Sequence, residues 1–466
     1  MKRLMVGVCA LCALGTVSAA GITNTNVIAE LKKLKLKAKT DKENPIDYKV
    51  GETIQFDFRL DGVKALPTGI KTPLYVIWER TGDDGKRQKG TNDVSLAKGF
   101  SVTTSLACPG IVRYVAQLVD ADYRKFEEVA ASQWEKGIRF DGGAGVETEK
   151  MKLTTVEPKD FDAFWTKAKA KLAAVPVKAK LTDATPEKLK GKFVVSAAEV
   201  DCLGPRPVTG WLTIPVGAKP KSLKAIATFD GYNGNSFNVP KAPARGRNDA
   251  IVFHVNAHGY EMTGHDLAYY KDFGNKVNGI GEGLPKRATY ALEPGDYKDP
   301  ADTYFYYMAM RLMRAYDYLK SLPEWDGKTL EAEGGSQGGL QTMWAASLVE
   351  GLTEARPSIT WGCDLGNSRF PKGGKFLSNG WGIPHEPNAF YFDAALHAKR
   401  VPASCSVHIK RLGMGDYTCP PRGVLLSYYL MKCPVKADLY QGSTHGYVPP
   451  QPNQIFTISH PASGRK

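Results

Sequence analysis

Residues 330–344 read Leu-Glu-Ala-Glu-Gly-Gly-Ser-Gln-Gly-Gly-Leu-Gln-Thr-Met-Trp. Their centre, 334–338, is a G-x-S-x-G pattern, in which glycines allow a tight turn that lifts a serine hydroxyl clear of the backbone. Residues 328–333 before the turn are typical of a short strand, and residues 337–349 after it are typical of a helix. The stretch therefore predicts a strand, a sharp turn and a helix, with Ser336 as the candidate nucleophile.

Strands and helices alternate around this turn. Residues 302–322 repeat apolar side chains at helical spacing, which predicts an amphipathic helix before it. The remaining predicted strands of this part are 193–200, 208–216, 225–229, 251–255, 358–361, 406–414 and 435–440, with helices opening at 157 and covering 422–431. Such alternation favours a mostly parallel α/β sheet. We expect this catalytic domain to occupy residues 157–466.

Two candidate catalytic side chains follow late strands. Asp416 follows the strand at 406–414, and His445 follows the strand at 435–440. The order Ser336, Asp416, His445 is that of an α/β-hydrolase, in which histidine takes the serine proton and the acid orients the histidine. Asp364 is the rival acid, but it follows the strand directly after Ser336, so its place in the usual order is poorer.

The oxyanion formed by serine attack needs two backbone donors. Gln337 N–H, directly after the nucleophile, supplies the first. Tyr232 N–H, in the loop after the strand at 225–229, is the candidate for the second. Further candidates line the substrate pocket: His258 and Tyr260 in the loop after 251–255, and Trp381. Tyr260 and Trp381 could stack on a sugar, although buried packing is the more common role of such rings.

The N-terminal part has a different pattern. Apolar residues alternate at 54, 56, 58 and 60, which is the period of a half-buried strand. Further strands are predicted at 73–80, 100–106 and 111–119. Several short strands separated by turns predict an all-β sandwich of immunoglobulin-like type over residues 21–140. The run Asp141-Gly-Gly-Ala-Gly145 predicts the start of a linker that covers residues 141–156.

Composition narrows the function classes. The chain has 466 residues, 42% of them hydrophobic and 24% charged, as expected for a folded protein of two domains. Its formal net charge of +14 comes from scattered lysines without a nucleic-acid-binding motif, so we expect a solvated basic surface and no nucleic-acid partner. Residues 1–20 have the basic, apolar and small-residue parts of a signal peptide. No later segment is long and apolar enough to span a membrane, so we expect a secreted or periplasmic protein.

Export would affect both the number of cysteines in the mature protein and whether they form disulfides. Removing Cys9 and Cys12 with the signal leaves six of the eight, none at metal-ligand spacing, so no metal site is expected. An oxidising compartment permits disulfides. Cys405 and Cys433 each precede a strand expected to lie beside the other, which makes them the candidate pair. Free buried thiols are the alternative.

Four stretches resemble one known family, the acetyl xylan esterases and cephalosporin C deacetylases of carbohydrate esterase family seven. They are Pro158-Lys-Asp-Phe-Asp-Ala-Phe-Trp165, 230–234, 334–339 and Gly415-Asp-Tyr-Thr-Cys-Pro-Pro421. The resemblance covers most of 152–447. It implies an α/β-hydrolase fold, the triad and oxyanion residues given above, and removal of short acyl groups from sugars such as acetylated xylan. It also implies no cofactor or metal, and ring-like homo-oligomers.

The chain departs from this family in two loops and by its added β-rich domain. Ala257-His-Gly-Tyr-Glu261 stands where the family has Arg-Gly-Gln, and His445-Gly446 where it has His-Glu. These changes bear on oligomeric state and on the substrate pocket. The leading hypothesis is a secreted serine esterase that deacetylates carbohydrate. The alternatives are a peptidase of prolyl-oligopeptidase type, which shares the triad order, and an inactive glycan-binding protein.

Overall fold

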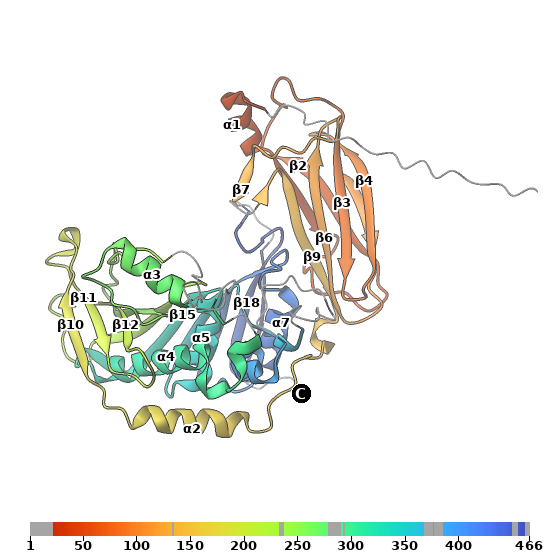
Figure 1. Ribbon diagram of the computed structural model, residues 1–466. Coiled ribbons are helices and arrows are strands. Elements are labelled where there is room, and N and C mark those ends of the chain that lie inside the picture. Colours follow the sequence, from red (N-terminus) through yellow and green to blue (C-terminus); the bar gives the residue numbers. More distant parts are fainter. Residues whose placement is uncertain are drawn as a thin grey trace, which may run out of the picture.

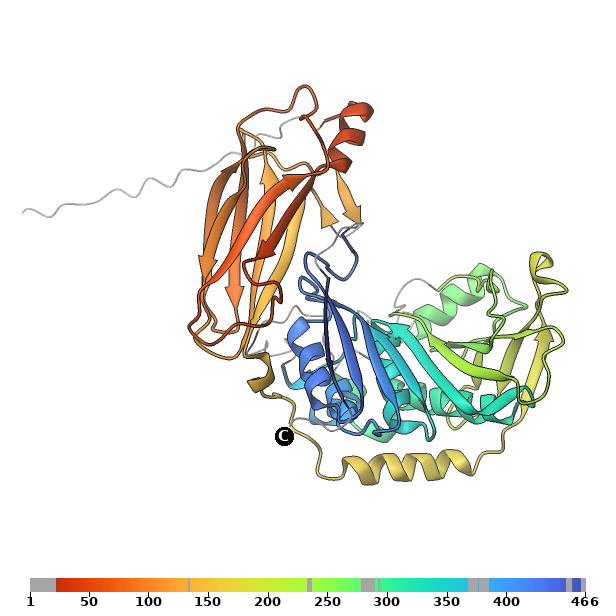
Figure 2. The same ribbon diagram turned by 180° about the vertical axis from the view of Figure 1, so that it is seen from behind.

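The computed structural model describes residues 22–132, 135–232, 237–277, 290–291, 294–367, 376, 385–449 and 455–461. Figure 1 shows two bodies of sheet: an N-terminal β-region, which covers residues 22–146, and a larger sheet flanked by helices. In both Figure 1 and Figure 2, the N-terminal β-region stands over the end of the large sheet that carries β18 (Val435–Tyr440) and helix α7 (Pro421–Leu430). Within the described residues, no helix is long and apolar enough to cross a membrane.

The N-terminal β-region consists mainly of two antiparallel sheets. One has the order β1 (Lys35–Thr40), β2 (Ile54–Asp61), β5 (Phe100–Thr104), and the other has the order β4 (Arg87–Val94), β3 (Leu74–Gly82), β6 (Gly110–Val119), β9 (Arg139–Val146). Helix α1 (Thr25–Lys33) precedes them, and β7 (Ala130–Ser132) pairs with β8 (Glu135–Lys136).

Aromatic rings from the two sheets meet in the core of this region. The Phe56 and Tyr114 rings lie 4.8 Å apart, and the Phe58 and Phe140 rings 5.5 Å apart. The predicted alternation over 54–60 is confirmed, since the four apolar side chains of β2 are all buried. This β-rich region before the catalytic fold agrees with the sequence prediction of a sandwich.

Residues 141–145, predicted as part of a linker, instead form most of strand β9, which pairs with β6. Their glycines serve close packing. A Cβ at Gly143 would lie 2.4 Å from the carbonyl oxygen of Val112, and one at Gly142 would lie 2.2 Å from Oε1 of Gln441. The glycines that suggested a linker instead allow tight contacts with neighbouring strands and loops.

The large sheet has ten strands, and the six strands β13 to β18 are parallel to one another. Their order is β10 (Ala179–Asp183), β11 (Phe193–Val200), β12 (Val208–Pro215), β14 (Ala250–Asn256), β13 (Leu223–Phe229), β15 (Trp325–Gly335), β16 (Glu354–Ser358), β17 (Ser406–Gly413), β18 and β19 (Ile455–His460). The end strands β10 to β12 and β19 are antiparallel to their neighbours. The predicted mostly parallel sheet is therefore confirmed, although β16 begins four residues before the strand predicted at 358–361.

Four helices cover one face of this sheet and contact one another in sequence: α4 (Tyr304–Ser321), α5 (Gln337–Leu348), α6 (Ala394–Ala398) and α7. Helix α2 (Phe161–Ala173) packs against α4, and α3 (Leu267–Val277) follows β14. Short 3-10 turns lie at Thr148–Lys150, Glu187–Leu189, Pro294–Tyr297, Pro300–Asp302, Leu365–Asn367 and Pro387–Phe392.

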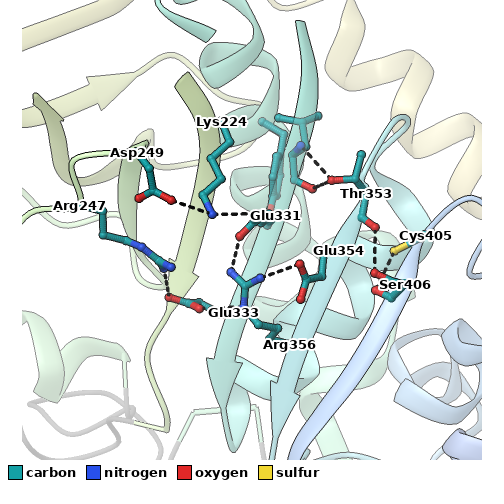
Figure 3. A network of polar contacts seen from close by, with 12 residues as sticks. Lys224, Arg247, Asp249, Glu331, Glu333, Thr353, Glu354, Arg356, Cys405 and Ser406 are labelled. Atoms are coloured by element: carbon teal, nitrogen blue, oxygen red, sulfur yellow. Dashed lines mark hydrogen bonds and ion pairs between the residues drawn. The ribbon is translucent and has the colours of Figure 1, made fainter. Parts of the chain in front are cut away.

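The face of β15 and β16 that points away from these four helices is charged. Leu330 and Ala332 of β15 belong to the main core, whereas Glu331 and Glu333 alternate with them and meet Arg356 of β16. Figure 3 shows how Lys224 of β13 extends this network, with its Nζ 3.2 Å from Glu331. Ion pairs therefore link the neighbouring strands on this face of the sheet.

Candidate active site

Ser336 occupies the turn between β15 and α5. Its backbone has φ 58° and ψ −118°, a region that non-glycine residues rarely adopt. The turn is held on both sides: Ser336 N–H donates to the Ser358 carbonyl at 3.0 Å, and its own carbonyl accepts from Trp361 N–H at 3.1 Å. Because strained backbone persists only where its surroundings fix it, this turn has the geometry of a nucleophile elbow.

The glycines of the motif allow neighbouring backbone to approach. A Cβ at Gly338 would lie 2.2 Å from the Phe229 carbonyl oxygen, and one at Gly334 would lie 2.6 Å from the Gly338 carbonyl oxygen. Residues with side chains cannot fit at these two positions without moving β13 or α5. The glycines therefore allow the tight turn that the pattern predicted. They also let β13 pass close under it.

Asp416 and His445 are in direct contact. Nδ1 of His445 lies 2.9 Å from Oδ2 of Asp416. The other carboxylate oxygen, Oδ1, accepts the backbone N–H groups of Thr418 at 3.0 Å and Cys419 at 2.9 Å. Asp416 is fully buried, while the side chain of His445 is 30% exposed. The carboxylate is thus fixed by two backbone donors and bonds one nitrogen of the imidazole, which leaves Nε2 for proton transfer.

The Cys419 thiol connects this pair with the serine. Burial, and next the Asp416 charge, hold the pKa of Cys419 well above its ordinary value, while the nearby Ser336 side chain acts in the opposite direction. One ligand atom each from Asp416, Cys419 and His445 lies within 4.8 Å of the others. The Cys419 thiol, which its raised pKa keeps protonated, therefore lies close to the Asp416–His445 pair and near Ser336. In the sequence, Cys419 stands out only as part of the 415–421 stretch, and no role for its thiol could be predicted.

The two oxyanion candidates lie beside the serine turn. Gln337 is the first residue of α5, so its N–H has no acceptor within the helix. The Tyr232 loop is close as well, since a Cβ at Gly231 would lie 3.7 Å from the Ser336 Cβ. Tyr290 links the two: its hydroxyl donates to Gln337 Oε1 at 2.7 Å, its carbonyl accepts from the Tyr232 hydroxyl at 2.7 Å, and the tyrosine rings stack at 4.2 Å.

Two of the predicted substrate contacts, His258 and Tyr260, have buried side chains. His258 and Tyr260 are only 3% and 7% exposed and lie among aromatic rings. His258 Nδ1 bonds the Tyr304 hydroxyl, and burial together with Arg311 lowers the pKa of His258 well below its ordinary value. The His258 ring also packs against Tyr290 at 5.2 Å, so it supports the wall behind the Tyr232 loop. Trp381 lies outside the described residues.

Asp364, the rival acid, faces another part of the chain. Its Oδ1 accepts the backbone N–H and the side-chain hydroxyl of both Thr154 and Thr155, at 2.7 to 3.2 Å. A second buried carboxylate, Asp393, accepts the Asp364 N–H at 3.1 Å. These bonds tie the chain segment before α2 to the sheet. The geometry thus favours Asp416 as the partner of His445.

The buried carboxylate of Asp393 should make stability depend on pH. Burial, and next the charge of Asp364, raise the pKa of Asp393 from 3.8 to about 6. Because the folded pKa is the higher one, the stabilising contribution is fully present below pH 3.8 and is lost as pH rises through about 6.

We expect the free energy of unfolding to fall by about 2 kcal/mol more in the wild type than in an Asp393→Asn variant between pH 4 and pH 7. Urea denaturation at several pH values measures this difference. Parallel pH profiles for the two proteins would contradict it.

The N-terminal β-region touches the loops of both Asp416 and His445. The Gln441 side chain accepts the Gly143 N–H at 2.9 Å and donates to the Gly143 carbonyl at 2.8 Å. A Cβ at Gly415 would lie 2.0 Å from the Asp141 carbonyl oxygen, so strand β9 lies directly against the Asp416 loop. These contacts were not predicted, because nothing local in the sequence relates residues so far apart.

Three side-chain contacts strengthen this junction. The Thr444 hydroxyl, next to His445 in the chain, donates to Glu135. The Arg113 guanidinium lies over the Tyr417 ring at 3.8 Å, next to Asp416 in the chain. Arg422 of α7 pairs with buried Asp83 at 3.3 Å. The N-terminal β-region is therefore a wall of the catalytic loops.

The predicted Cys405–Cys433 disulfide is not formed. Both thiols are buried and free, and burial, followed by the proximity of Cys433, raises the pKa of Cys405. Strands β17 and β18 do lie side by side as expected, with Val407 opposite Val435. The Cys405 thiol donates instead to the Ser406 carbonyl at 3.5 Å. The free-thiol alternative describes all six cysteines of the described residues.

A serine on a strained strand-to-helix turn, followed in the chain by an acid and a histidine after later parallel strands, characterises the α/β-hydrolase fold. A solved structure shares this fold: acetyl xylan esterase 1 from Thermoanaerobacterium sp. JW/SL YS485, with TM-score 0.50, 17% identity, and 66% of this chain and 94% of that chain covered. An acetyl xylan esterase from Paenibacillus sp. R4 has TM-score 0.48 and 23% identity, over 64% of this chain and 93% of that one.

Residues 146–368 match the family described as acetyl xylan esterase (AXE1), and the chain carries a domain of that family. A curated relative is the acetyl esterase Axe7A of Xylanibacter ruminicola, 26% identical over 308 residues, which make up 62% of this chain. The match spans 64% of that relative's length. The family predicted from the four sequence stretches is thereby confirmed.

Proposed function

We propose that this protein is an exported serine esterase that removes acetyl groups from carbohydrate, such as acetylated xylan or xylo-oligosaccharides. The observation that carries the proposal is the bond between buried Asp416 and His445, beside a serine on a strained turn. The acetyl xylan esterase domain supports the choice of acyl group and substrate class. Export rests on the signal-like residues 1–20, and N-terminal sequencing of the exported protein tests it.

In the proposed reaction, Ser336 Oγ attacks the acetyl carbonyl while His445 Nε2 takes the serine proton. The N–H groups of Gln337 and Tyr232 hold the oxyanion of the tetrahedral intermediate. His445 then gives the proton to the departing sugar oxygen, which leaves an acetyl group on Ser336. Water, activated by His445, attacks this ester, so acetate is released and the serine is restored. Asp416 keeps the imidazole in the tautomer that can accept the proton.

Cys419 enters this proposal as a positioning residue. A neutral thiol near Ser336 can orient the serine side chain without competing for the acyl group, because a thiol attacks carbonyls only as the thiolate. His258 and Tyr260 act through the aromatic wall that supports the Tyr232 loop.

Release of acetate from acetylated xylo-oligosaccharides by the purified protein tests the proposal. We expect turnover of these substrates and of p-nitrophenyl acetate, with rates falling for longer acyl chains. Cleavage of prolyl peptides without acetate release would point instead to a peptidase. Retention on carbohydrate without any turnover, and without fluorophosphonate labelling of Ser336, would point to a glycan-binding protein.

A further inference from the structure

A cavity of about 590 Å³ lies where the N-terminal β-region meets the loop that carries His445. Its walls come from β1, β2, the 129–140 segment and the 441–449 loop. The volume falls in the range of roughly 300 to 1,000 Å³ that is usual for ligand sites. None of the residues that line this cavity takes part in the proposed reaction.

The lining is basic. It contains two acidic residues, Asp57 and Glu135, and six basic ones: Lys32, Lys35, Lys37, Lys39, Arg59 and Arg139. The two acids are already engaged, because Asp57 accepts from Gln55 and Ser101 while Glu135 accepts from Thr444. The cavity therefore has an excess of positive charge.

Four of the six basic side chains form no ion pair. Lys37 pairs with Asp61 and Arg139 with Asp141, whereas Lys32, Lys35, Lys39 and Arg59 form no ion pair within the part of the chain that the structure describes. Arg59 stands directly opposite Lys37 in the β1–β2 register, and the charge of Asp61 attracts both of these cations.

The cavity also offers groups suited to sugars. β1 is the end strand of its sheet, and six consecutive residues, 34–39, line the cavity, so backbone donors and acceptors of a free strand edge face it. Tyr447 and Pro449 of the 441–449 loop supply apolar surface against which a sugar ring can lie. Lysines on an edge strand also prevent strands from pairing between molecules, but that role requires neither Arg59 nor a hollow.

We infer that this cavity binds a carboxylate-bearing oligosaccharide, such as a glycan branch that ends in a uronic acid. The inference rests on the proposed function, because it makes the cavity a subsite for acidic branches of the acetylated substrate. Gly442 and Tyr447, which line the cavity, belong to the same loop as His445, so the cavity and the proposed base share one loop. A hollow of about 590 Å³ has room for a short anionic glycan, whereas a nucleic acid needs an extended basic surface.

Calorimetric titration of the full-length Ser336→Ala protein tests the binding without turnover. The ligands are a uronic-acid-substituted xylo-oligosaccharide without acetyl groups and the neutral oligosaccharide of the same length. We expect the acidic ligand to bind at least tenfold more tightly, with the preference shrinking at high salt. Equal affinity for the two ligands would overturn the inference.

A charge-reversed pair of residues localises the effect. Lys39→Glu with Arg59→Glu should abolish the preference for the acidic ligand. Lys64→Glu with Lys89→Glu makes the same change of net charge at exposed positions outside the cavity and should keep the preference. Both pairs must show wild-type thermal unfolding. Loss of the preference in both pairs, or displacement of the ligand by a DNA oligonucleotide at equal affinity, would mean an unspecific response to charge and overturn the inference.

Kinetics separate this inference from the proposed function. The Lys39→Glu, Arg59→Glu enzyme should hydrolyse p-nitrophenyl acetate at the wild-type rate, while its KM rises about tenfold for an acetylated substrate with a uronic acid branch. An active esterase with no preference for acidic ligands would refute the cavity inference alone. Acidic-glycan binding by a protein that releases no acetate would refute the proposed esterase alone.

Discussion

Replacing Ser336 with alanine is expected to lower kcat on p-nitrophenyl acetate by about 10⁵- to 10⁶-fold, because the attacking oxygen is removed. The neighbouring Cys419 thiol should not take over, since burial raises its pKa well above the ordinary value and keeps it protonated. Initial rates at high enzyme concentration measure the residual activity. Thermal unfolding of the variant should match the wild type.

Ser347→Ala is a matched control on the same helix. The Ser347 hydroxyl bonds the Trp344 carbonyl and His397, away from the serine turn, and its loss should leave kcat within a few-fold of wild type. If Ser336→Ala retained more than a hundredth of the wild-type rate, Ser336 would not be the nucleophile.

Asp416→Asn should lower kcat by about 10⁴-fold with little change in KM. The reason lies in the two backbone N–H groups that bond Oδ1 of Asp416. They require the asparagine oxygen at that position, so the amide NH₂ group would face His445 Nδ1. The imidazole would then carry its proton on Nε2 and could not accept one from Ser336.

Asp364→Asn is the discriminating comparison, since sequence reasoning left Asp364 as the rival acid. Its bonds run to Thr154 and Thr155, so its loss should reduce stability and leave kcat nearly unchanged. A kcat that fell in Asp364→Asn and persisted in Asp416→Asn would reverse the assignment of the acid.

The serine turn and the order of the parallel strands could be predicted because local chemistry determines them. Gly334 and Gly338 mark positions without room for a Cβ, and short apolar runs mark the buried strands β13 and β14. Asp416 and His445 could be placed because residues after neighbouring parallel strands meet at one edge of a sheet.

Other features depend on contacts between distant residues. The start of β16 was missed because its residues are charged: Arg356 pairs with Glu331 and Glu333 of β15 and with Glu354 of its own strand. The glycines at 142–145 resembled a linker, since sequence alone does not show that Gln441 packs against them. Cys419 had no visible role until the fold placed its thiol beside Ser336.

The contact between Gly143 and Gln441 joins residues 298 positions apart and has a consequence for how this enzyme matures. The His445 loop can reach its final shape only after both the first and the last parts of the chain have folded and docked. Such long-range contacts form late, since closing a long loop must precede them. In the proposed mechanism, partly folded chains would therefore hold Ser336 without His445 in place, so hydrolytic activity should emerge only as assembly completes. For the same reason, grafting the N-terminal β-region onto another hydrolase would require matching loops as well as a matching linker.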